Sequence, residues 1–295
     1  MIVIFSKKFA YHNDSSHIEN NRRIKTIYRA IKESDVKIEK PYKFNKKIYK
    51  IINLAHSWKY IKNIKKKMLY SFKNRKILYI DSDTYISPLS YYSVFSSVLS
   101  VIKAINIIKE HEKIFIPTRP PGHHAGKNGL ANITQGFCIF NNVAIGAMYA
   151  RKKYRVLILD IDIHHGNGTE EIVRDKKNIF FISTHAKGIY PFTGLSSYKN
   201  IINYPLEYGT NDKKYIEIFQ EILNKIKEID PDIIFVSLGF DMHHKDPLSV
   251  FNVTLDSYKF VFEKLKDFRV IYVLEGGYNL NVLYEGTRIL LNIYK

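Results

Sequence analysis

The stretch LILDIDIHHGNGT, from Leu157 to Thr169, joins an apolar run directly to a cluster of acidic residues, histidines and glycines. Its first half is typical of a buried β-strand. Asp160, Asp162 and His164 follow on alternate positions, so their side chains leave the same face of an extended segment. The stretch therefore predicts a strand whose carboxyl end carries polar functional groups.

Other apolar runs rich in β-branched residues predict further strands, at 114–117, 179–182, 233–239 and 270–274. Helical periodicity is found at 21–33, 90–110, 140–152, 213–229, 256–267 and 280–294. Continuous apolar strands separated by helices predict an α/β fold with a central parallel sheet flanked by helices on both faces. No linker divides the chain, so we expect a single domain over residues 1–295. MIVIF at the N-terminus predicts an edge or first strand.

Polar motifs follow each predicted strand at its carboxyl end. They are RPPGHHAG at 119–126, the segment from Asp160 to Thr169, STH at 183–185, Phe240-Asp241, and EGGY at 275–278. In parallel α/β sheets, ligands bind outside the carboxyl ends of the strands. We therefore expect these motifs to meet in one crevice.

Asp162 and His164 offer a carboxylate and an imidazole for a metal ion. Asp241 is the best candidate for a third ligand, because it ends another strand at the same edge of the sheet. Two carboxylates and one imidazole suit zinc with an open coordination position.

His123 and His124 are adjacent, so each needs its own orienting partner. The candidates are Asp160 for His123 and Asn167 for His124. Imidazoles can act as base toward water and as acid toward a leaving amine. A carboxylate partner would raise the pKa of its histidine, whereas an amide partner would leave the other histidine closer to a base. His243-His244 is expected to be incidental.

Tyr278 follows two glycines, which permit close backbone approach, and its hydroxyl can donate to a developing oxyanion. Other catalytic patterns are absent: the sequence has no GxSxG, HExxH, P-loop or dinucleotide fingerprint.

Taken in order, RPPGHHA, GFCIFNN, LDIDIHHGNGT, STH, GFD, DPL and EGGYN resemble the zinc-dependent histone deacetylase family, which also includes acetylpolyamine amidohydrolases. The resemblance runs from about residue 17 to the C-terminus and implies the arginase–deacetylase fold. It implies Asp162, His164 and Asp241 as zinc ligands, His124 as general base, His123 as its electrostatic partner and Tyr278 as the group that polarises the carbonyl. Asn167, where other members carry Asp, is similar to the class II and polyamine branch, so we expect a class II-like, prokaryotic-type member.

The resemblance also implies a substrate tunnel and a second cation. Gly136, Phe137 and Tyr190 match the family's acyl-lysine tunnel. In resembling polyamine enzymes a glutamate can stand seven residues after the third metal ligand, and this position is Leu248 here. A structural potassium ion would use Asp160, Asp162 and His164 together with Ser183 and Thr184.

The net charge of +18 is concentrated in the first part of the chain. Residues 1–113 hold 24 basic against 9 acidic side chains, and residues 114–295 hold 22 against 19. This pattern indicates either a nucleic-acid or anionic-lipid surface or, as we favour, a lysine-rich solvated face. The single cysteine, Cys138, excludes an internal disulfide and fits a reducing cytoplasm. No run approaches the roughly 18 uninterrupted apolar residues of a membrane helix, so we expect no membrane partner.

The sequence thus predicts a cytoplasmic zinc amidohydrolase that removes an acetyl or small acyl group from acyl-lysine side chains. An acetylated polyamine is the alternative substrate. A basic nucleic-acid-binding protein with a vestigial site is the remote alternative.

Overall fold

The computed structural model describes residues 1–295 and is built around one eight-stranded parallel sheet. The strand order is β10-β9-β8-β11-β12-β5-β1-β2. These strands are β1 (Ile2–Ile4), β2 (Lys37–Glu39), β5 (Lys113–Ile116), β8 (Val156–Asp160), β9 (Ile179–Ala186), β10 (Ile201–Leu206), β11 (Ile233–Leu238) and β12 (Val270–Leu274). The predicted parallel sheet is confirmed.

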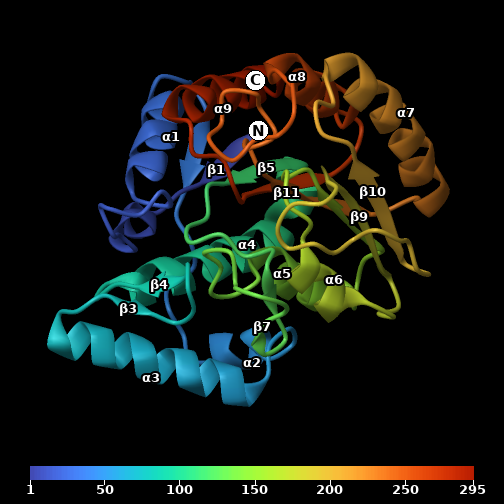
Figure 1. Cartoon of the computed structure of the whole chain (residues 1–295). Coiled ribbons are helices and arrows are strands. Elements are labelled where there is room, and N and C mark those ends of the chain that lie inside the picture. The colour runs from blue at the N-terminus through green and yellow to red at the C-terminus, as the bar shows by residue number, and fades with distance from the viewer.

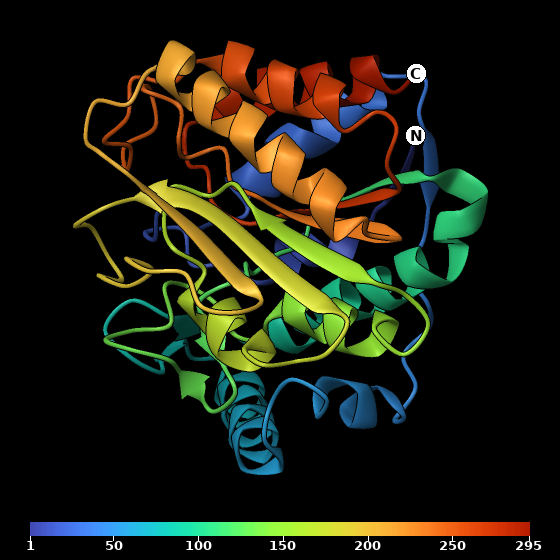
Figure 2. The ribbon, with the colours of Figure 1, turned by 90° about the vertical axis from the view of Figure 1, so that its right-hand side faces the viewer.

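Helices cover both faces of this sheet (Figures 1 and 2). One layer contains α1 (Arg22–Lys32), α7 (Asp212–Ile229), α8 (Leu255–Lys264) and α9 (Leu280–Ile293). The other contains α4 (Ser90–His111), α5 (Asn142–Ala150) and α6 (Asn167–Val173). Beyond this second layer lie α2 (Ile48–Ile52) and α3 (Trp58–Asn74). The remaining short elements are η1 (Lys7–Tyr11) and two hairpins, formed by β3 (Leu78–Tyr79) with β4 (Tyr85–Ile86) and by β6 (Ala125–Gly126) with β7 (Gly129–Leu130).

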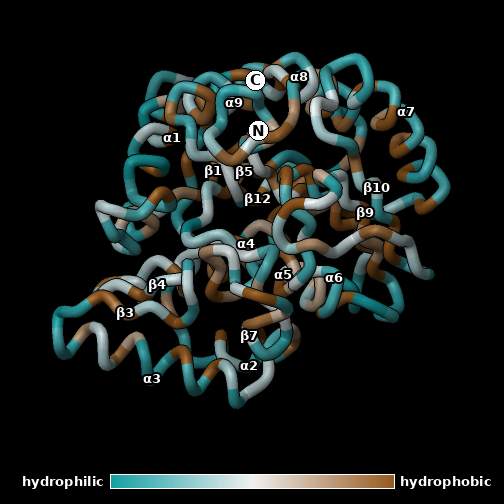
Figure 3. The backbone as a smooth tube through the Cα atoms, in the orientation of Figure 1, coloured by the Kyte–Doolittle hydropathy of each residue, from teal (hydrophilic) through white to brown (hydrophobic).

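The five central strands β5, β8, β9, β11 and β12 lie where the sequence predicts them. The side chains of β5, β8, β11 and β12 are all buried, which matches their unbroken apolar runs. In Figure 3, hydrophobic residues gather around this sheet and on the inner sides of the helices. Helix starts follow local capping chemistry: the side chain of Asn141, for example, accepts a hydrogen bond from the backbone N–H of Ala144 at the start of α5.

Two elements bear on expectations from the sequence. The N-terminal run, predicted as an edge or first strand, forms the first strand, β1, and lies inside the edge because it pairs with both β5 and β2. Helix α4 is long and apolar enough to cross a membrane, judged by length and composition alone. Polar residues interrupt its apolar sequence, so it contains no uninterrupted apolar run of that length. Its side chains are mostly buried inside this fold, where it packs against α5 and the sheet as a core helix.

The register of the central strands brings the polar motifs to one edge of the sheet. Asp160 at the end of β8 pairs with Ser183 on β9 and with Ser237 on β11. The neighbouring strands β12 and β5 end at the same side and lead into EGGY and RPPGHHAG. The loops that follow these parallel strands therefore share one crevice.

Candidate functional site

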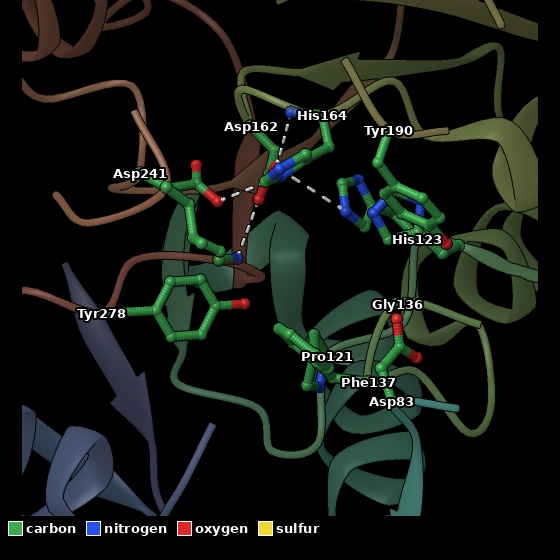
Figure 4. Close-up of a pocket in the computed structure, with 13 residues that line it drawn as sticks. Asp83, Pro121, His123, Gly136, Phe137, Asp162, His164, Tyr190, Asp241 and Tyr278 are labelled. Carbon is green, nitrogen blue, oxygen red and sulfur yellow. Dashed lines mark hydrogen bonds and ion pairs between the residues drawn. The ribbon is translucent and has the colours of Figure 1, made fainter. Parts of the chain in front are cut away.

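Asp162, His164 and Asp241 form a compact cluster at the carboxyl ends of β8 and β11. One ligand atom from each lies within 4.8 Å of the others. The Nδ1 atom of His164 is 3.1 Å from Asp162 Oδ1 and 3.6 Å from Asp241 Oδ2. The structure thus brings together the three residues that the sequence proposes as metal ligands (Figure 4).

The donor set of this cluster fits a divalent cation. Asp241 Oδ2 is buried and has no hydrogen-bond partner, although its other oxygen accepts from the backbone N–H of Ile163 at 3.1 Å. Burial and the neighbouring charge of Asp162 raise the pKa of Asp241 to about 7. Two buried carboxylates this close are costly unless a positive charge lies between them.

The backbone of the EGGY segment after β12 packs against the carboxylates of this cluster. The backbone N–H of Gly276 donates to Asp162 Oδ2 at 2.8 Å. A Cβ at position 276 would overlap the carboxylates of Asp241 and Asp162, so only glycine permits this approach.

His123 and His124 point to different partners, and the partners are those that the sequence proposes. His123 Nδ1 lies 3.0 Å from Asp160 Oδ2, and His124 Nδ1 lies 2.8 Å from Asn167 Oδ1. With a hydrogen on each Nδ1, both Nε2 atoms are left free for other partners.

These two environments shift the pKa values of the two histidines in opposite directions. Burial opposes the charged form of His123, but the carboxylates of Asp162 and Asp160 raise its pKa to about 10. Burial, together with the nearby His123 and His164, holds the pKa of His124 well below its usual value. At neutral pH His124 is therefore the member of the pair that can accept a proton.

Tyr278 lies across the pocket from His123 (Figure 4). Its backbone N–H donates to Asp246 Oδ2 at 2.6 Å, and its ring packs 4.8 Å from the guanidinium of Arg23. Burial raises the pKa of Tyr278 well above 10, so the hydroxyl remains a proton donor. Figure 4 shows this hydroxyl turned into the pocket.

A pocket of about 200 Å³ connects these groups to solvent. The predicted tunnel residues Gly136, Phe137, Tyr190 and Leu248 all line it, together with the site residues already described. Gly136 has a φ of +48°, and a Cβ there would overlap the ring of His124. The tight turn at Gly136 therefore lets the pocket wall pass beside that ring.

Asp83 also lines the pocket, and the sequence analysis missed it. It lies between β3 and β4, where its carboxylate accepts from the hydroxyls of Thr134 at 2.7 Å and Thr84 at 3.0 Å. The acidic pair in DSDTY, at 81–85, is the only signal in the sequence, and it does not indicate which loop reaches the pocket.

A buried ionic network behind the pocket was also missed. Glu19 binds the guanidinium groups of both Arg119 and Arg23, with Glu19 Oε2 2.8 Å from Arg119 Nη2. Arg23 Nε donates to the carbonyl of Gly277 at 2.6 Å. Glu275 accepts from the backbone N–H of Gly122 at 2.6 Å, which ties EGGY to the loop of the two histidines. Arg119 and Glu275 stand inside predicted motifs, but Glu19 pairs with Arg119 across 100 residues of sequence and Glu275 with Gly122 across 153.

Of the residues proposed for potassium, Asp160 at the end of β8 lies beside Ser183 on β9, and Thr184 is the next residue of β9. Thr184 Oγ1 is 3.4 Å from the backbone oxygen of Asp160 and 3.1 Å from the hydroxyl of Tyr215. The hydroxyl of Ser183 lies 2.9 Å from His185 Nδ1. His243 and His244, expected to be incidental, do not line the pocket.

His56 is a further buried histidine, and it supports the loop of the histidine pair from behind. Its Nδ1 lies 2.8 Å from the carbonyl of Gly126, and its Nε2 accepts from the backbone N–H of Asn141 at 2.9 Å. Asn141 in turn donates to the carbonyl of Ala125 at 3.2 Å. Burial lowers the pKa of His56 to about 4.

This buried histidine should make the fold sensitive to acid. Because the ordinary value is 6.5, the unfolded chain binds an extra proton here between about pH 6.5 and 4. His56 alone should therefore lower the free energy of unfolding by about 2 kcal/mol between pH 7.5 and 5. Urea denaturation at both pH values checks this: the loss should shrink by that amount in His56→Gln but not in His111→Gln. An unchanged loss in His56→Gln would show that other groups carry the acid sensitivity.

Comparisons with known proteins agree with this geometry. A family model described as histone deacetylase domain matches residues 17–294. A probable deacetylase of Methanothermobacter thermautotrophicus is 32% identical, over 96% of this chain and 87% of the relative. The solved HD domain of HDA15 is 26% identical, with a TM-score of 0.89, and covers 100% of this chain and 90% of that structure. An acetylpolyamine aminohydrolase from Burkholderia pseudomallei, 20% identical, shares the fold with a TM-score of 0.87, over 100% of this chain and 98% of that structure.

Proposed function

Since this chain belongs to the histone deacetylase family, we propose that it is a zinc-dependent amidohydrolase that removes acetyl or small acyl groups from lysine side chains. Membership of the family supports deacetylase activity. The metal, the residue roles and the substrate are the parts that we propose.

One observation carries the proposal. A neutral histidine, a protonated histidine, a tyrosine hydroxyl and a buried cluster of two carboxylates with one imidazole line the same pocket. Amide hydrolysis needs a base for water, a donor for the carbonyl oxygen and a proton for the leaving amine.

Asp162, His164 and Asp241 would hold the zinc ion. When bound, such an ion supplies Lewis-acid chemistry, which polarises a carbonyl and lowers the pKa of water. We also propose a structural potassium ion near Asp160, Ser183 and Thr184, supported by the oxygen atoms that β8 and β9 place there.

His124, His123 and Tyr278 then have different roles in the reaction. His124, oriented by Asn167, accepts a proton as water adds to the acyl carbonyl, and returns it to the amine as the C–N bond breaks. His123, held protonated by Asp160, stabilises the negative charge that develops. Tyr278 donates a hydrogen bond to the carbonyl oxygen, and the products are a carboxylic acid, which ionises in water, and a free amine.

The two histidines should therefore differ in importance. His124→Ala removes the proposed base, whereas His123→Ala removes only an electrostatic neighbour. We expect His124→Ala to lower kcat about tenfold further than His123→Ala does. Steady-state kinetics on an acetyl-lysine peptide decide this, and the reverse order would exchange the two roles.

The pocket lining bears on the substrate. Leu248 stands where a glutamate would pair with a polyamine, and it offers apolar contact without a counter-charge. This favours the neutral stem of an acyl-lysine side chain. Asp83, however, brings a carboxylate to the same pocket, and this observation supports acetylated polyamines as a second candidate.

Turnover of acyl-lysine peptides against acetylpolyamines tests the substrate directly. We expect a higher kcat/KM for acetyl-lysine peptides than for acetylspermidine. Leu248→Glu should shift that ratio toward the polyamine about fivefold, because a partly exposed ion pair is worth roughly 1 kcal/mol. Leu248→Met is the matched control and should leave the ratio unchanged. Faster hydrolysis of acetylspermidine by the unaltered protein would replace the main substrate with the second candidate.

A further inference from the structure

Residues 40–80 carry 13 lysine and arginine side chains and not one aspartate or glutamate. This segment comprises α2, α3, β3 and the loops that join them. The lysine-rich composition of the chain does not explain it, because residues 114–295 hold 22 basic and 19 acidic side chains. None of the 13 takes part in an ion pair.

Four of these lysines form a stripe along one face of helix α3. Lys59, Lys62, Lys66 and Lys73 are all exposed and follow one another at three-, four- and seven-residue spacing, so they lie on one helix face. The buried face of α3 is formed by other residues, Tyr60, Ile61, Ile64, Met68 and Ser71. In Figure 1 the helix lies at the border of the molecule, on the side away from α7 to α9.

An aromatic groove runs beside this lysine stripe. It has a volume of about 210 Å³, lies between α3 and α4, and is lined by Lys65, Met68, Leu69, Phe72, Tyr91 and Tyr92. Within residues 40–80, six of the eight exposed large hydrophobic side chains are aromatic. Trp58, the one tryptophan of the chain, is 43% exposed and lies on the same helix face as Leu69 and Phe72.

We propose that this surface, the lysine stripe and the aromatic groove of α3, binds single-stranded nucleic acid. Unpaired lysines neutralise phosphates, and exposed aromatic rings beside them stack on unpaired bases without regard to sequence. A concave groove fits a base better than it fits a flat bilayer. In a duplex the bases stack on one another, so they could not also stack on the aromatic lining of the groove. The β3–β4 hairpin, which carries Asp83, follows α3 in the chain after a short loop.

Trp58 supplies the readout. The full chain is titrated with unlabelled dT20 at low salt while the tryptophan fluorescence is followed. Stacking of bases should quench the fluorescence to saturation, and the affinity should fall steeply as salt is added. Vesicles of phosphatidylglycerol and phosphatidylcholine provide the second arm, since insertion into lipid would shift the emission to shorter wavelength instead.

A matched pair of variants separates this surface from net charge. K62Q/K65Q/K66Q should weaken dT20 binding at least about tenfold and reduce the salt slope by about 2, since each phosphate contact on a single strand contributes about 0.7. K213Q/K214Q/K227Q, on exposed lysines of α7, removes the same charge and should leave the affinity within about twofold. The midpoint of thermal unfolding verifies that both variants fold, independently of any deacetylase activity.

The proposal is overturned by any of four results, of which three concern the titrations above. These are no quenching of Trp58 by dT20 at about 10 μM, an equal loss of affinity in the α7 variant, or a blue shift with anionic vesicles in place of a response to dT20. Binding of a 20-base-pair duplex as tight as that of dT20 would also overturn it, because stacking would then add nothing.

Discussion

Asp241→Ala should yield a protein that has lost its metal ion and its turnover. The remaining ligands, Asp162 and His164, come from one segment after β8, and two such ligands cannot hold a divalent cation firmly. We expect metal content after dialysis to fall from about one ion per chain to a trace, and kcat to fall by at least about 10³. Elemental analysis and steady-state kinetics on an acetyl-lysine peptide measure the two effects.

Two further variants keep this test sharp. Asp241 Oδ1 also accepts a hydrogen bond from Ile163, so Asp241→Asn preserves an acceptor while it removes the charge. It should fold as the wild type does and still bind the metal poorly. Asp267→Ala, at an exposed aspartate, is the control and should retain both metal and activity. Full metal occupancy in both Asp241 variants would mean that the third ligand lies elsewhere.

Tyr278→Phe should keep the fold and the metal but lose turnover. The substitution removes one hydroxyl, and the backbone of residue 278 stays bound to Asp246. Loss of one oxyanion donor typically lowers kcat by roughly 10²–10³, or about 3–4 kcal/mol. KM should change little, because the hydrogen bond strengthens mainly in the transition state.

Tyr190→Phe is the matched control for this hydroxyl. Tyr190 lines the same pocket, but its hydroxyl donates to the backbone oxygen of Thr134 at 3.0 Å and forms part of the wall. We expect its loss to lower kcat far less than Tyr278→Phe does. Equal effects of the two substitutions would show that Tyr278 acts through packing.

The parts of the fold that the sequence predicts are those with a strong local pattern. Five buried strands carry unbroken apolar runs, and each predicted strand matches an observed one. The edge strands β2 and β10 have no such run: β2 has three residues, of which two are charged, and β10 includes a proline. Helix α6 begins with NGT, a sequence typical of a turn, so its local pattern does not predict a helix.

The site residues that the sequence predicts are likewise those with a clear local pattern. Residues that directly follow a strand, such as Asp162, Asp241 and Tyr278, could be assigned because parallel strands end at a common edge. Asp83 could not, because it comes from a hairpin outside the main sheet. The pairing of Glu19 with Arg119 joins residues 100 positions apart, and no local pattern reveals such a contact.

The proposed reaction is a metal-dependent hydrolysis of an acyl-lysine amide. The decisive measurement is acetate release from an acetyl-lysine peptide by one preparation in three states: as purified, stripped with a chelator, and reconstituted with one equivalent of zinc. We predict turnover in the first state, none above background in the second, and recovery in the third. Undiminished acetate release by the stripped protein would contradict the account.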